Sequence, residues 1–398
     1  MAVITSRRLQ GVGEYYFARK LQEIEMLRKE GRSILNLGIG SPDLPPHPDV
    51  IEALTDAAQK PDRHAYPPYR GIPLLRQAMS DWYQQWYSVA LDPETEILPL
   101  MGSKEGILHL CMTYLNPGDR VLVPDPGYPS YASAVRLAGA KPITYSLTEK
   151  NQYEPDWDRL EQLDLTRVKL FFVNYPQMPT GHSGSRELFA RLVDFARRKN
   201  LLLVHDNPYS FILQEKPLSL LSIPGANEVA VELNSLSKSH NMAGWRVGML
   251  CGQAKYLNDV IRFRSNMDSG FFIPIQLAAV KALQLTPSWY ESMNAIYRAR
   301  QKKVFELLRS IGCRFLANQS GLFVWAKAPS KWGNKVFEAH EWGRGGWFSD
   351  VLLNEVGLFL TPGGIFGKQG KPYIRISLCS NETIFNEAIE RIEKTQNS

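Results

Sequence analysis

The segment around Lys238 holds the residue types needed to bind a phosphorylated aldehyde. Ser235, Ser237 and Lys238 follow an apolar run that predicts a strand, and Arg246 lies eight positions after the lysine. A lysine placed there lies at the sheet edge where α/β proteins bind ligands. A desolvated amine near other cations attacks aldehydes, and the hydroxyls and Arg246 suit a phosphate dianion. Taken alone, a loop lysine is more often a solvated surface group.

A second segment offers partners for a cofactor ring. The apolar run 201–205 ends in Asp206, and Tyr209 follows three positions later. A carboxylate that keeps the ring nitrogen of pyridoxal phosphate protonated makes the ring an electron sink, and a phenol can bond the ring oxygen. A helix cap or a turn is the alternative role for Asp206.

Two further loops would complete such a site. Gly102, Ser103 and Lys104 precede a helical pattern, so their N–H groups and the helix dipole would face an anion. A plain N-cap at Ser103 is the alternative. Tyr128 lies on a predicted turn, where it is suited equally to stacking on a flat ring and to packing in the core.

Arg375 is a candidate for binding a carboxylate. It lies within Tyr373–Leu378, which alternates like a strand and surrounds the arginine with β-branched residues. An arginine in so apolar a strand needs an anionic partner, and its planar guanidinium fits a carboxylate with two parallel hydrogen bonds. A structural ion pair is the alternative.

The elements that must position these residues alternate between helix and strand from about residue 50 to 285. Leu75, Met79, Trp82 and Trp86 predict one amphipathic helix, and a stripe beginning at Leu188 predicts another. Short connections between strand, helix and strand predict a mostly parallel sheet. The buried strands are predicted at residues 120–124, 169–174, 201–205 and 229–233.

After residue 285 the pattern becomes α+β. Thr286 and Pro287 predict the start of a long helix, which could connect two domains. Strands near 322–326 and 373–378 and a terminal helix follow. The first 48 residues are compatible with packing against either part.

Composition excludes several classes of protein. At 398 residues, the chain exceeds the roughly 250–300 residues at which one core stops growing, and its net charge is only +6 without a block of like charges. We therefore expect no nucleic acid partner. Four widely spaced cysteines disfavour a zinc site or a disulfide framework, and no H-E-x-x-H motif indicates a metal. Without an apolar leader or an eighteen-residue apolar run, we expect a cytoplasmic protein with no membrane partner.

In their order along the chain, these motifs resemble those of fold-type-I pyridoxal-phosphate enzymes, and among them the class I/II aminotransferases related to aspartate aminotransferase. The similarity includes Ser-x-Ser-Lys with the later arginine, the strand-ending aspartate with its tyrosine, and Pro179-Thr180-Gly181. It spans most of the chain. It implies an α/β fold with a mostly parallel sheet sandwiched by helices, in a large cofactor-binding domain at 46–286. Residues 1–45 and 287–398 would form a smaller α+β domain with an N-terminal arm.

The resemblance also implies roles for the candidate residues. Lys238 would hold pyridoxal phosphate as a Schiff base and shuttle a proton, while Arg375 binds the α-carboxylate of an amino acid or a 2-oxo acid. Ile39 and Gly40 would line the substrate pocket. Tyr66 matches a tyrosine that reaches the neighbouring subunit's phosphate, which implies a homodimer with shared sites. The implied cofactor-binding set is Tyr66, Gly102, Ser103, Lys104, Tyr128, Asn174, Met178, Asp206, Tyr209, Ser235, Ser237, Lys238 and Arg246.

One position departs from the family pattern. Relatives usually carry an asparagine directly before Pro-Thr-Gly, where its amide bonds the cofactor's ring oxygen, whereas this chain has Met178. A thioether cannot replace that donor. Gln177 and Asn174 are the candidates to restore the bond, and a net hydrogen bond of about 1 kcal/mol is at stake.

Two other functions are open on the same scaffold. A pyridoxal-phosphate lyase would use the same site for elimination, and a cofactor-sensing regulator would use it without catalysis. Relatives specific for dicarboxylates bring an arginine from the other subunit after a Ser-Asn motif, whereas the corresponding neighbourhood here, 265–272, is aromatic, which favours a neutral or aromatic substrate side chain. Diaminopimelate aminotransferases are also similar, but typically carry an acidic residue at the position of Tyr69, which counts against that substrate. His205 and His240 lie beside the key residues, and we expect packing or supporting roles for them.

Overall fold

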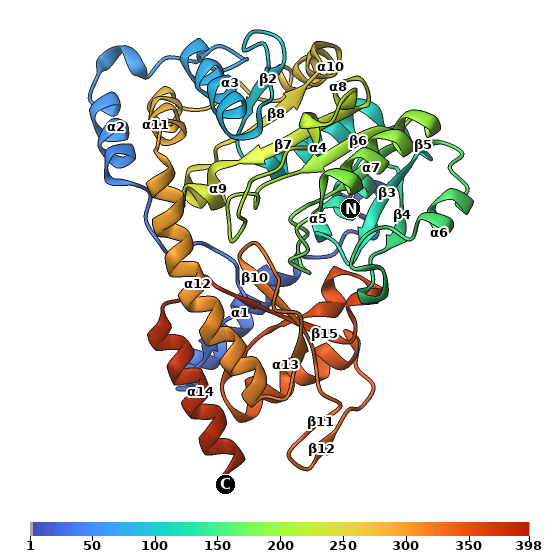
Figure 1. Ribbon diagram of the computed structural model, residues 1–398, viewed down its shortest axis with the longest axis vertical. Helices are drawn as coiled ribbons and strands as arrows, with labels where there is room; N and C mark the ends of the chain where they lie inside the picture. Colours follow the sequence, from blue (N-terminus) through green and yellow to red (C-terminus); the bar gives the residue numbers. More distant parts are fainter. Residues whose placement is uncertain (1–2, 398) are drawn as a thin grey trace.

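A seven-stranded sheet forms the upper part of the molecule in the computed structural model, which describes residues 3–397 (Figure 1). Its strand order is β2-β8-β7-β6-β5-β3-β4. Strand β8 runs antiparallel to both of its neighbours, and the other pairs are parallel. The predicted mostly parallel sheet is therefore confirmed. The strands are β2 (Ile97–Leu100), β3 (Arg120–Asp125), β4 (Lys141–Ser146), β5 (Val168–Val173), β6 (Leu202–Asp206), β7 (Ala230–Ser235) and β8 (Gly248–Gly252).

Helices cover both faces of this sheet. On β5, Leu170 and Phe172 pack into one hydrophobic core, whereas Phe171 and Val173 pack into the other. This division follows from the alternation of side chains along a strand. One core includes α4 (Ser103–Tyr114), α5 (Pro129–Leu137) and α10 (Ala254–Arg264). The other includes α3 (Pro73–Tyr87), α7 (Arg186–Lys199) and α11 (Ile273–Leu283), and α2 (Pro48–Ala58) packs on α11.

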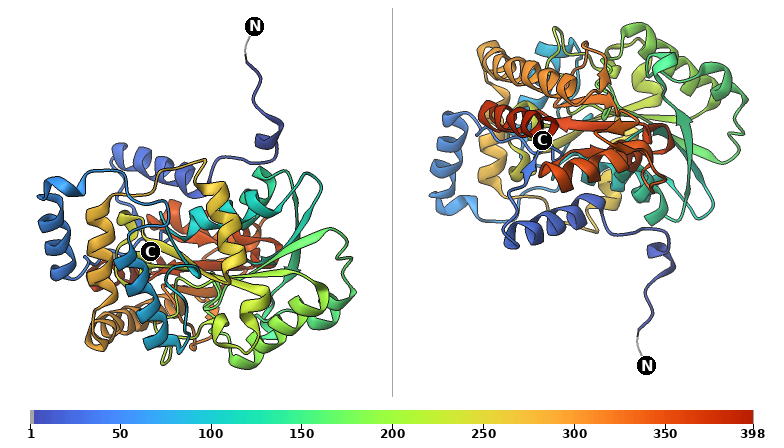
Figure 2. Two further views of the ribbon diagram at one scale, coloured as in Figure 1. Left: turned by 90° about the horizontal axis from the view of Figure 1, so that it is seen from above. Right: turned by 90° about the horizontal axis from the view of Figure 1, so that it is seen from below.

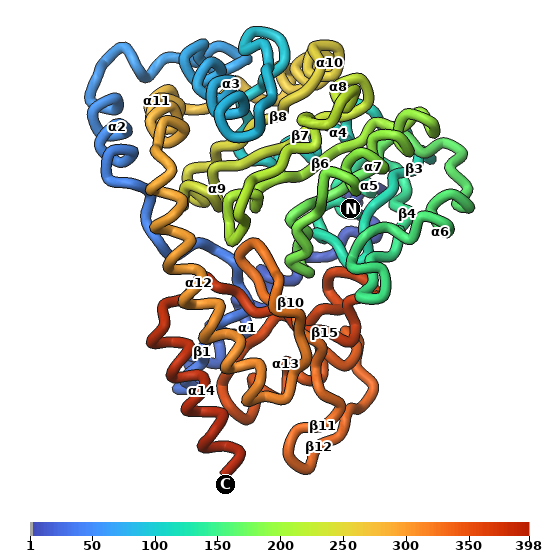
Figure 3. The backbone as a smooth tube through the Cα atoms, viewed as in Figure 1, coloured from blue at the N-terminus to red at the C-terminus, as the bar shows by residue number. Residues whose placement is uncertain are grey.

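A second, antiparallel sheet forms the lower part, in the order β14-β15-β10-β9. Helix α12 (Pro287–Ser310) runs from the upper part into the lower part (Figures 1 and 3). Thr286 and Pro287 begin this helix as predicted, although the Thr286 hydroxyl contacts Ser288 rather than a backbone N–H. The other elements here are β9 (Arg314–Phe315), β10 (Phe323–Lys327), α13 (Gly343–Glu355), β14 (Thr361–Pro362), β15 (Tyr373–Ser377) and α14 (Glu382–Gln396).

The N-terminal segment packs against the C-terminal part of the chain. Strand β1 (Leu35–Asn36) pairs in parallel with β13 (Leu358–Phe359). Ile24 of α1 (Tyr16–Lys29) joins a small core with Leu353 and Phe359. Figure 3 shows this blue segment beside the red one, and Figure 2 shows that the segment from Val3 onward, with η1 (Arg7–Leu9), projects away from the body.

Short elements complete the fold. They are η2 (Pro61–Arg63), η3 (Glu149–Asn151), α6 (Trp157–Gln162), η4 (Leu220–Ser222), α8 (Ala226–Val229), α9 (Leu236–Ser239), η5 (Ala243–Trp245), β11 (Lys331–Trp332), β12 (Lys335–Val336), η6 (Gly363–Phe366) and η7 (Lys368–Gly370). Among the described residues, none of the helices is both long enough and apolar enough to span a membrane.

The aromatic core beneath the sheet predicts a large stability difference between two phenylalanine variants. Phe195 of α7 is fully buried and packs edge-on against Phe171 of β5. Phe195→Ala should lower the free energy of unfolding by about 3–5 kcal/mol, because it leaves a cavity in a close-packed layer. Phe337→Ala is the control, since Phe337 is 38% exposed, and should cost less than about 1 kcal/mol. Urea unfolding followed by fluorescence measures both, and equal losses would contradict the assignment of this core.

Candidate active site

One cavity of about 510 Å³ collects almost all of the candidate residues. It lies where the carboxyl ends of β5, β6 and β7 face the lower sheet, as expected for an α/β protein. Tyr66 and Gly102 are the two candidates that do not line it. The candidates in its wall are Ile39, Gly40, Ser103, Lys104, Tyr128, Asn174, Met178, Asp206, Tyr209, Ser235, Ser237, Lys238, Arg246 and Arg375.

Lys238 reaches into this cavity from the short helix α9, directly after β7. Its Nζ donates a hydrogen bond of 2.8 Å to the backbone oxygen of Gly40. Burial lowers the pKa of the Lys238 amine, and the nearby cations Arg375 and Arg246 lower it further, while Cys379 opposes them. The amine is thus held where it is shielded from water and readily becomes a nucleophile.

Asp206 presents an unpaired carboxylate oxygen at the end of β6. The side chain is 5% exposed, and its Oδ2 accepts a hydrogen bond of 2.7 Å from the Tyr131 hydroxyl. Oδ1 is buried without a hydrogen-bond partner. Burial raises the pKa of Asp206 to about 6, although the Tyr131 hydrogen bond and the His205 charge lower it. A cationic N–H would satisfy this oxygen, so the role of a simple cap or turn is not supported.

The loop before α4 and the segment after α9 meet at the same end of the cavity. Gly102 is the N-cap of α4 with φ +87°, a conformation that favours glycine, and a Cβ there would collide with the Arg246 guanidinium. Ser103 is the first helical residue, so the alternative of an N-cap at Ser103 is wrong. Arg246 Nη1 donates to the oxygen of Ala243 at 2.9 Å and lies 3.5 Å from Ser237 Oγ. Helix N-terminus, hydroxyls and guanidinium together suit a phosphate.

Arg375 on β15 is a buried cation without a carboxylate partner among the described residues. Its Nη2 donates to the Gly38 oxygen at 3.0 Å, and its Nε is buried without a partner. The guanidinium carbon lies 3.7 Å from the centre of the Phe323 ring and 4.7 Å from that of Phe366. Burial lowers the pKa of Arg375 to about 10. The alternative of a structural ion pair is therefore not supported, and a bound carboxylate would supply the missing anion.

Met178 takes an unexpected place beside this arginine. Its Sδ lies 3.3 Å from Arg375 Nη1 and accepts a weak hydrogen bond. The Asn174 amide donates a hydrogen bond to the backbone oxygen of Asp206 and accepts one from the Met178 N–H. Gln177 binds the Pro126 oxygen and Thr180. Both amides are engaged with the protein, so neither takes over the missing asparagine's bond in this structure.

The three tyrosine candidates differ in placement. Tyr209 is nearly buried and lines the cavity, and Tyr128 lines it from the N-cap of α5. The Tyr128 ring meets Tyr131 edge-on with centroids 5.6 Å apart, so one ring face is free of this neighbour. Tyr66 is 87% exposed and lies outside the cavity of its own chain.

Sequence reasoning missed several aromatic residues of the wall. Tyr131 binds Asp206, and its position in the same turn as Tyr128 was an available signal. Phe323 and Phe366 stack on Arg375, but nothing in their local sequence indicates this. The N-terminal residues Tyr15 and Phe17 also line the cavity, and Lys104 Nζ lies 4.7 Å from the Tyr15 ring centre.

Potential metal ligands lie close together at one place within residues 3–397, outside the cavity. Glu105, His109 and Asp268 bring ligand atoms within 4.8 Å of one another. The Arg264 guanidinium already binds Asp268, with Nε 3.0 Å from Oδ2. Because Arg264 already neutralises the Asp268 carboxylate that a metal ion would need as a ligand, we assign no metal site to these residues.

Comparison with known proteins identifies the family. The model of the class I and II aminotransferases matches residues 32–392. The LL-diaminopimelate aminotransferase of Dehalococcoides mccartyi is 39% identical over 97% of this chain and 96% of its own length, and that of Aquifex aeolicus is 38% identical over 98% of both. Among solved structures, substrate-bound BacF from Bacillus subtilis has a TM-score of 0.91 and 36% identity, covering 99% and 98% of the two chains. An aminotransferase from Staphylococcus aureus has a TM-score of 0.87 and 28% identity, covering 99% of both.

The family's cofactor agrees with the geometry. Enzymes of this family use pyridoxal phosphate. The protonated ring nitrogen of this cofactor can donate a hydrogen bond, and Asp206 Oδ1 is a buried acceptor without a donor. These relatives support amino-group transfer rather than the lyase alternative. The chain therefore belongs to the class I and II aminotransferases and is a pyridoxal-phosphate-dependent enzyme that transfers amino groups.

Proposed function

We propose that this enzyme moves an amino group from an L-amino acid with a neutral or aromatic side chain to a 2-oxo acid, with Lys238, Asp206 and Tyr209 as its catalytic residues. The observation that carries the assignment is the buried, unpaired Oδ1 of Asp206 in the same cavity as the Lys238 amine. The site would lie between a large domain at 46–286 and a small one formed by 1–45 and 287–398.

The cofactor would be held at three points. Gly102, Ser103, Lys104, Ser235, Ser237 and Arg246 would bind its phosphate, and Tyr66 of a partner subunit would join them. Tyr128 and Met178 would flank the ring, with Asn174 fixing the strand end. When bound, pyridoxal phosphate supplies an electron-accepting ring that stabilises negative charge at the substrate's Cα. Asp206 would keep its ring nitrogen protonated, and Tyr209 would donate to its ring oxygen.

The chain's own residues then perform the positioning and the proton transfer. Arg375 would bind the substrate's α-carboxylate with its free guanidinium edge, beside the backbone of Ile39 and Gly40. The Lys238 amine, whose pKa is lowered by burial, would take the proton from the substrate's Cα. The aromatic walls exclude water from this step.

The cavity wall supports a neutral or aromatic substrate side chain. The cations of its described lining are Lys238, Arg246, Arg375 and Lys104, and the last, proposed to bind the phosphate, lies against the Tyr15 ring. Tyr15, Phe17 and Phe323 offer aromatic surface instead. The relatives named for LL-diaminopimelate make that compound the second candidate, but it carries a second ammonium and a second carboxylate, whereas the charged residues of this lining, Asp206 and the four cations, are already assigned to the cofactor or to the α-carboxylate.

A homodimer is part of the proposal. Tyr66 is 87% exposed, and the projecting N-terminal segment exposes 98% of Val3 and 91% of Ile4 (Figure 2). Exposed apolar side chains of this kind are typical of an interface with another copy. We also propose a cytoplasmic setting, in keeping with four cysteines that are all free.

A panel of amino donors tests the substrate class. With pyruvate as acceptor, phenylalanine and neutral donors should react at least about tenfold faster than aspartate, because the cations of the described lining are all assigned to the cofactor or to the α-carboxylate. Initial rates at equal donor concentrations measure this preference. A strong preference for aspartate or for LL-diaminopimelate would contradict the substrate class while leaving the reaction itself intact.

The Asp206 carboxyl predicts an unusual pH dependence of stability in the cofactor-free protein. Its pKa is about 6 in the folded state against 3.8 unfolded, so folding favours the protonated form and loses stability as the pH rises from 4 through 6. Asp206→Asn should therefore raise the free energy of unfolding at pH 7.5 by up to about 3 kcal/mol and have little effect near pH 4. Urea unfolding across this pH range measures it. Asp62→Asn, at a side chain 70% exposed, is the control and should show no such trend.

Hybrid dimers test the shared site. Lys238→Ala and Tyr66→Ala chains should each be impaired alone, yet their co-purified hybrid should regain up to about half of the wild-type activity per dimer. One of its two sites then has both residues intact, because Tyr66 comes from the other subunit. A hybrid no more active than its parents would place Tyr66 at its own chain's site.

A further inference from the structure

A second buried pair of ionisable residues lies next to the cavity without lining it. His205 precedes Asp206 on β6, and Glu232 is its register partner on β7. Both side chains are fully buried, and His205 Nδ1 lies 2.7 Å from Glu232 Oε2. Because neighbouring residues on a strand point to opposite faces, the imidazole lies on the face of the sheet opposite to the Asp206 carboxylate. The proposed reaction gives neither residue a role.

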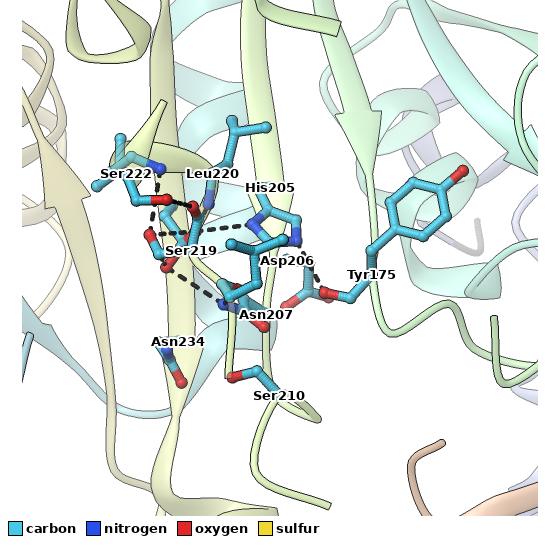
Figure 4. Close-up of polar contacts among 12 residues, drawn as sticks. Tyr175, His205, Asp206, Asn207, Ser210, Ser219, Leu220, Ser222 and Asn234 are labelled. Carbon is cyan, nitrogen blue, oxygen red and sulfur yellow. Dashed lines mark hydrogen bonds and ion pairs between the residues drawn. The ribbon is translucent and has the colours of Figure 1, made fainter. Parts of the chain in front are cut away.

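The hydrogen bonds of the imidazole require two protons. His205 Nε2 lies 2.9 Å from the backbone oxygen of Tyr175, which can only accept, so this nitrogen carries a proton. Nδ1 faces a carboxylate oxygen, so a second proton lies between Nδ1 and Oε2. Figure 4 shows His205 between the segment that contains Ser219 and Leu220 on one side and Tyr175 on the other, with dashed lines in both directions.

The surroundings of Glu232 assign the second proton to the histidine. Its carboxylate accepts hydrogen bonds from four further donors, at 2.9–3.3 Å, and two of them are a backbone N–H and an amide N–H, which cannot accept in return. Hydrogen bonds to the ionised form stabilise a carboxylate, and each is strengthened by the charge. His205 is therefore an imidazolium. The four donors are Tyr83 Oη, Asn207 Nδ2, Ser219 Oγ and the Leu220 N–H.

The remaining titratable groups around the pair are neutral. Burial raises the pKa values of Tyr83 and Tyr87 on α3 and of Cys251 on β8, and the Glu232 charge adds to the rise in each. On the other side the apolar Phe189 ring meets the imidazole, with centroids 5.0 Å apart. Of these described neighbours, Glu232 is therefore the one whose charge compensates that of His205.

This pair acts on Asp206 in two ways. The His205 charge lowers the pKa of the Asp206 carboxyl, against the burial that raises it. The His205 ring also links the end of β6 to Tyr175, which follows β5, and to Glu232 on β7. Asn174 adds a hydrogen bond of 2.6 Å to the backbone oxygen of Asp206 at the same strand end. His205 thus affects the Asp206 carboxylate twice, through its charge and through the strand ends that it holds together.

We infer that His205, held as an imidazolium by Glu232, is a positioning residue that keeps the Asp206 carboxylate ionised and in place for the ring nitrogen of the cofactor. This inference rests on the proposed role of Asp206. His205 acts through Asp206 and touches neither substrate nor cofactor.

Nitrogen NMR of the full-length enzyme with its cofactor tests the inference, using 15N-labelled histidine and a 15N-labelled cofactor ring. Both nitrogens of His205 should be protonated in the wild-type enzyme. In Glu232→Gln, His205 should lose its second proton, and the cofactor's ring nitrogen should be protonated in a smaller fraction of the molecules than in the wild type, because without the imidazolium charge the Asp206 carboxyl takes up more of the proton that the two groups share. These signals report protonation states, which a merely structural role would not move.

His109→Asn is the matched control, because His109 is fully buried, has no hydrogen bond on either nitrogen, and has a pKa lowered to about 4 by burial. A single proton on His205 in the wild type, or the same protonated fraction of the ring nitrogen in Glu232→Gln and in the control, would overturn the inference. If Glu232→Gln does not fold, His205→Asn gives the same comparison for the ring nitrogen. A chain that bound no cofactor would contradict the proposed function instead, and the His205 signals would still be readable.

Discussion

The structure depends on a single electrostatic constraint: opposite charges are buried in one cavity without pairing with each other. Asp206 holds an oxygen without a partner, and Arg375 holds a guanidinium nitrogen without one. Each buried charge is costly unless a ligand completes it. The upper sheet supplies the anion and the lower sheet the cation, so the two parts of the molecule together create a space that suits a ligand with a cationic end and an anionic end.

Local packing explains how this constraint is tolerated. Asp206 is supported by Tyr131 and, through the strand, by His205, whereas Arg375 is enclosed by Phe323 and Phe366. A guanidinium is weakly hydrated and stacks well on aromatic rings, which lowers the cost of burying it without a carboxylate. Met178 fits the same environment, because its sulfur is polarisable and accepts only weakly.

The sequence allowed much of the upper part to be predicted, because the signals there are local. The apolar runs that end at Asp206 and at Ser235 are strands whose carboxyl ends meet at one edge, which placed Lys238 and Asp206 in the same site. The aromatic residues around Arg375 could not be predicted in this way, since Phe17, Phe323 and Phe366 are brought together by chain folding rather than by spacing. The same holds for Glu232, whose partner His205 becomes its neighbour only through the register of β6 and β7. The packing of the first 48 residues was also undetermined, because a two-residue strand such as β1 has no periodicity to recognise.

The bond between Arg375 and the Gly38 oxygen joins residues 337 positions apart, and Thr361 binds the same oxygen from 323 positions away. The chain is synthesised from its N-terminus, so almost the entire protein must be made before the partners of the Gly38 oxygen exist. The upper sheet, by contrast, is complete once β8 has been made. The carboxylate binding that we propose for Arg375 is therefore the last part of the site to be made, and a ribosome that stops before residue 375 releases a protein that has Lys238 and lacks Arg375.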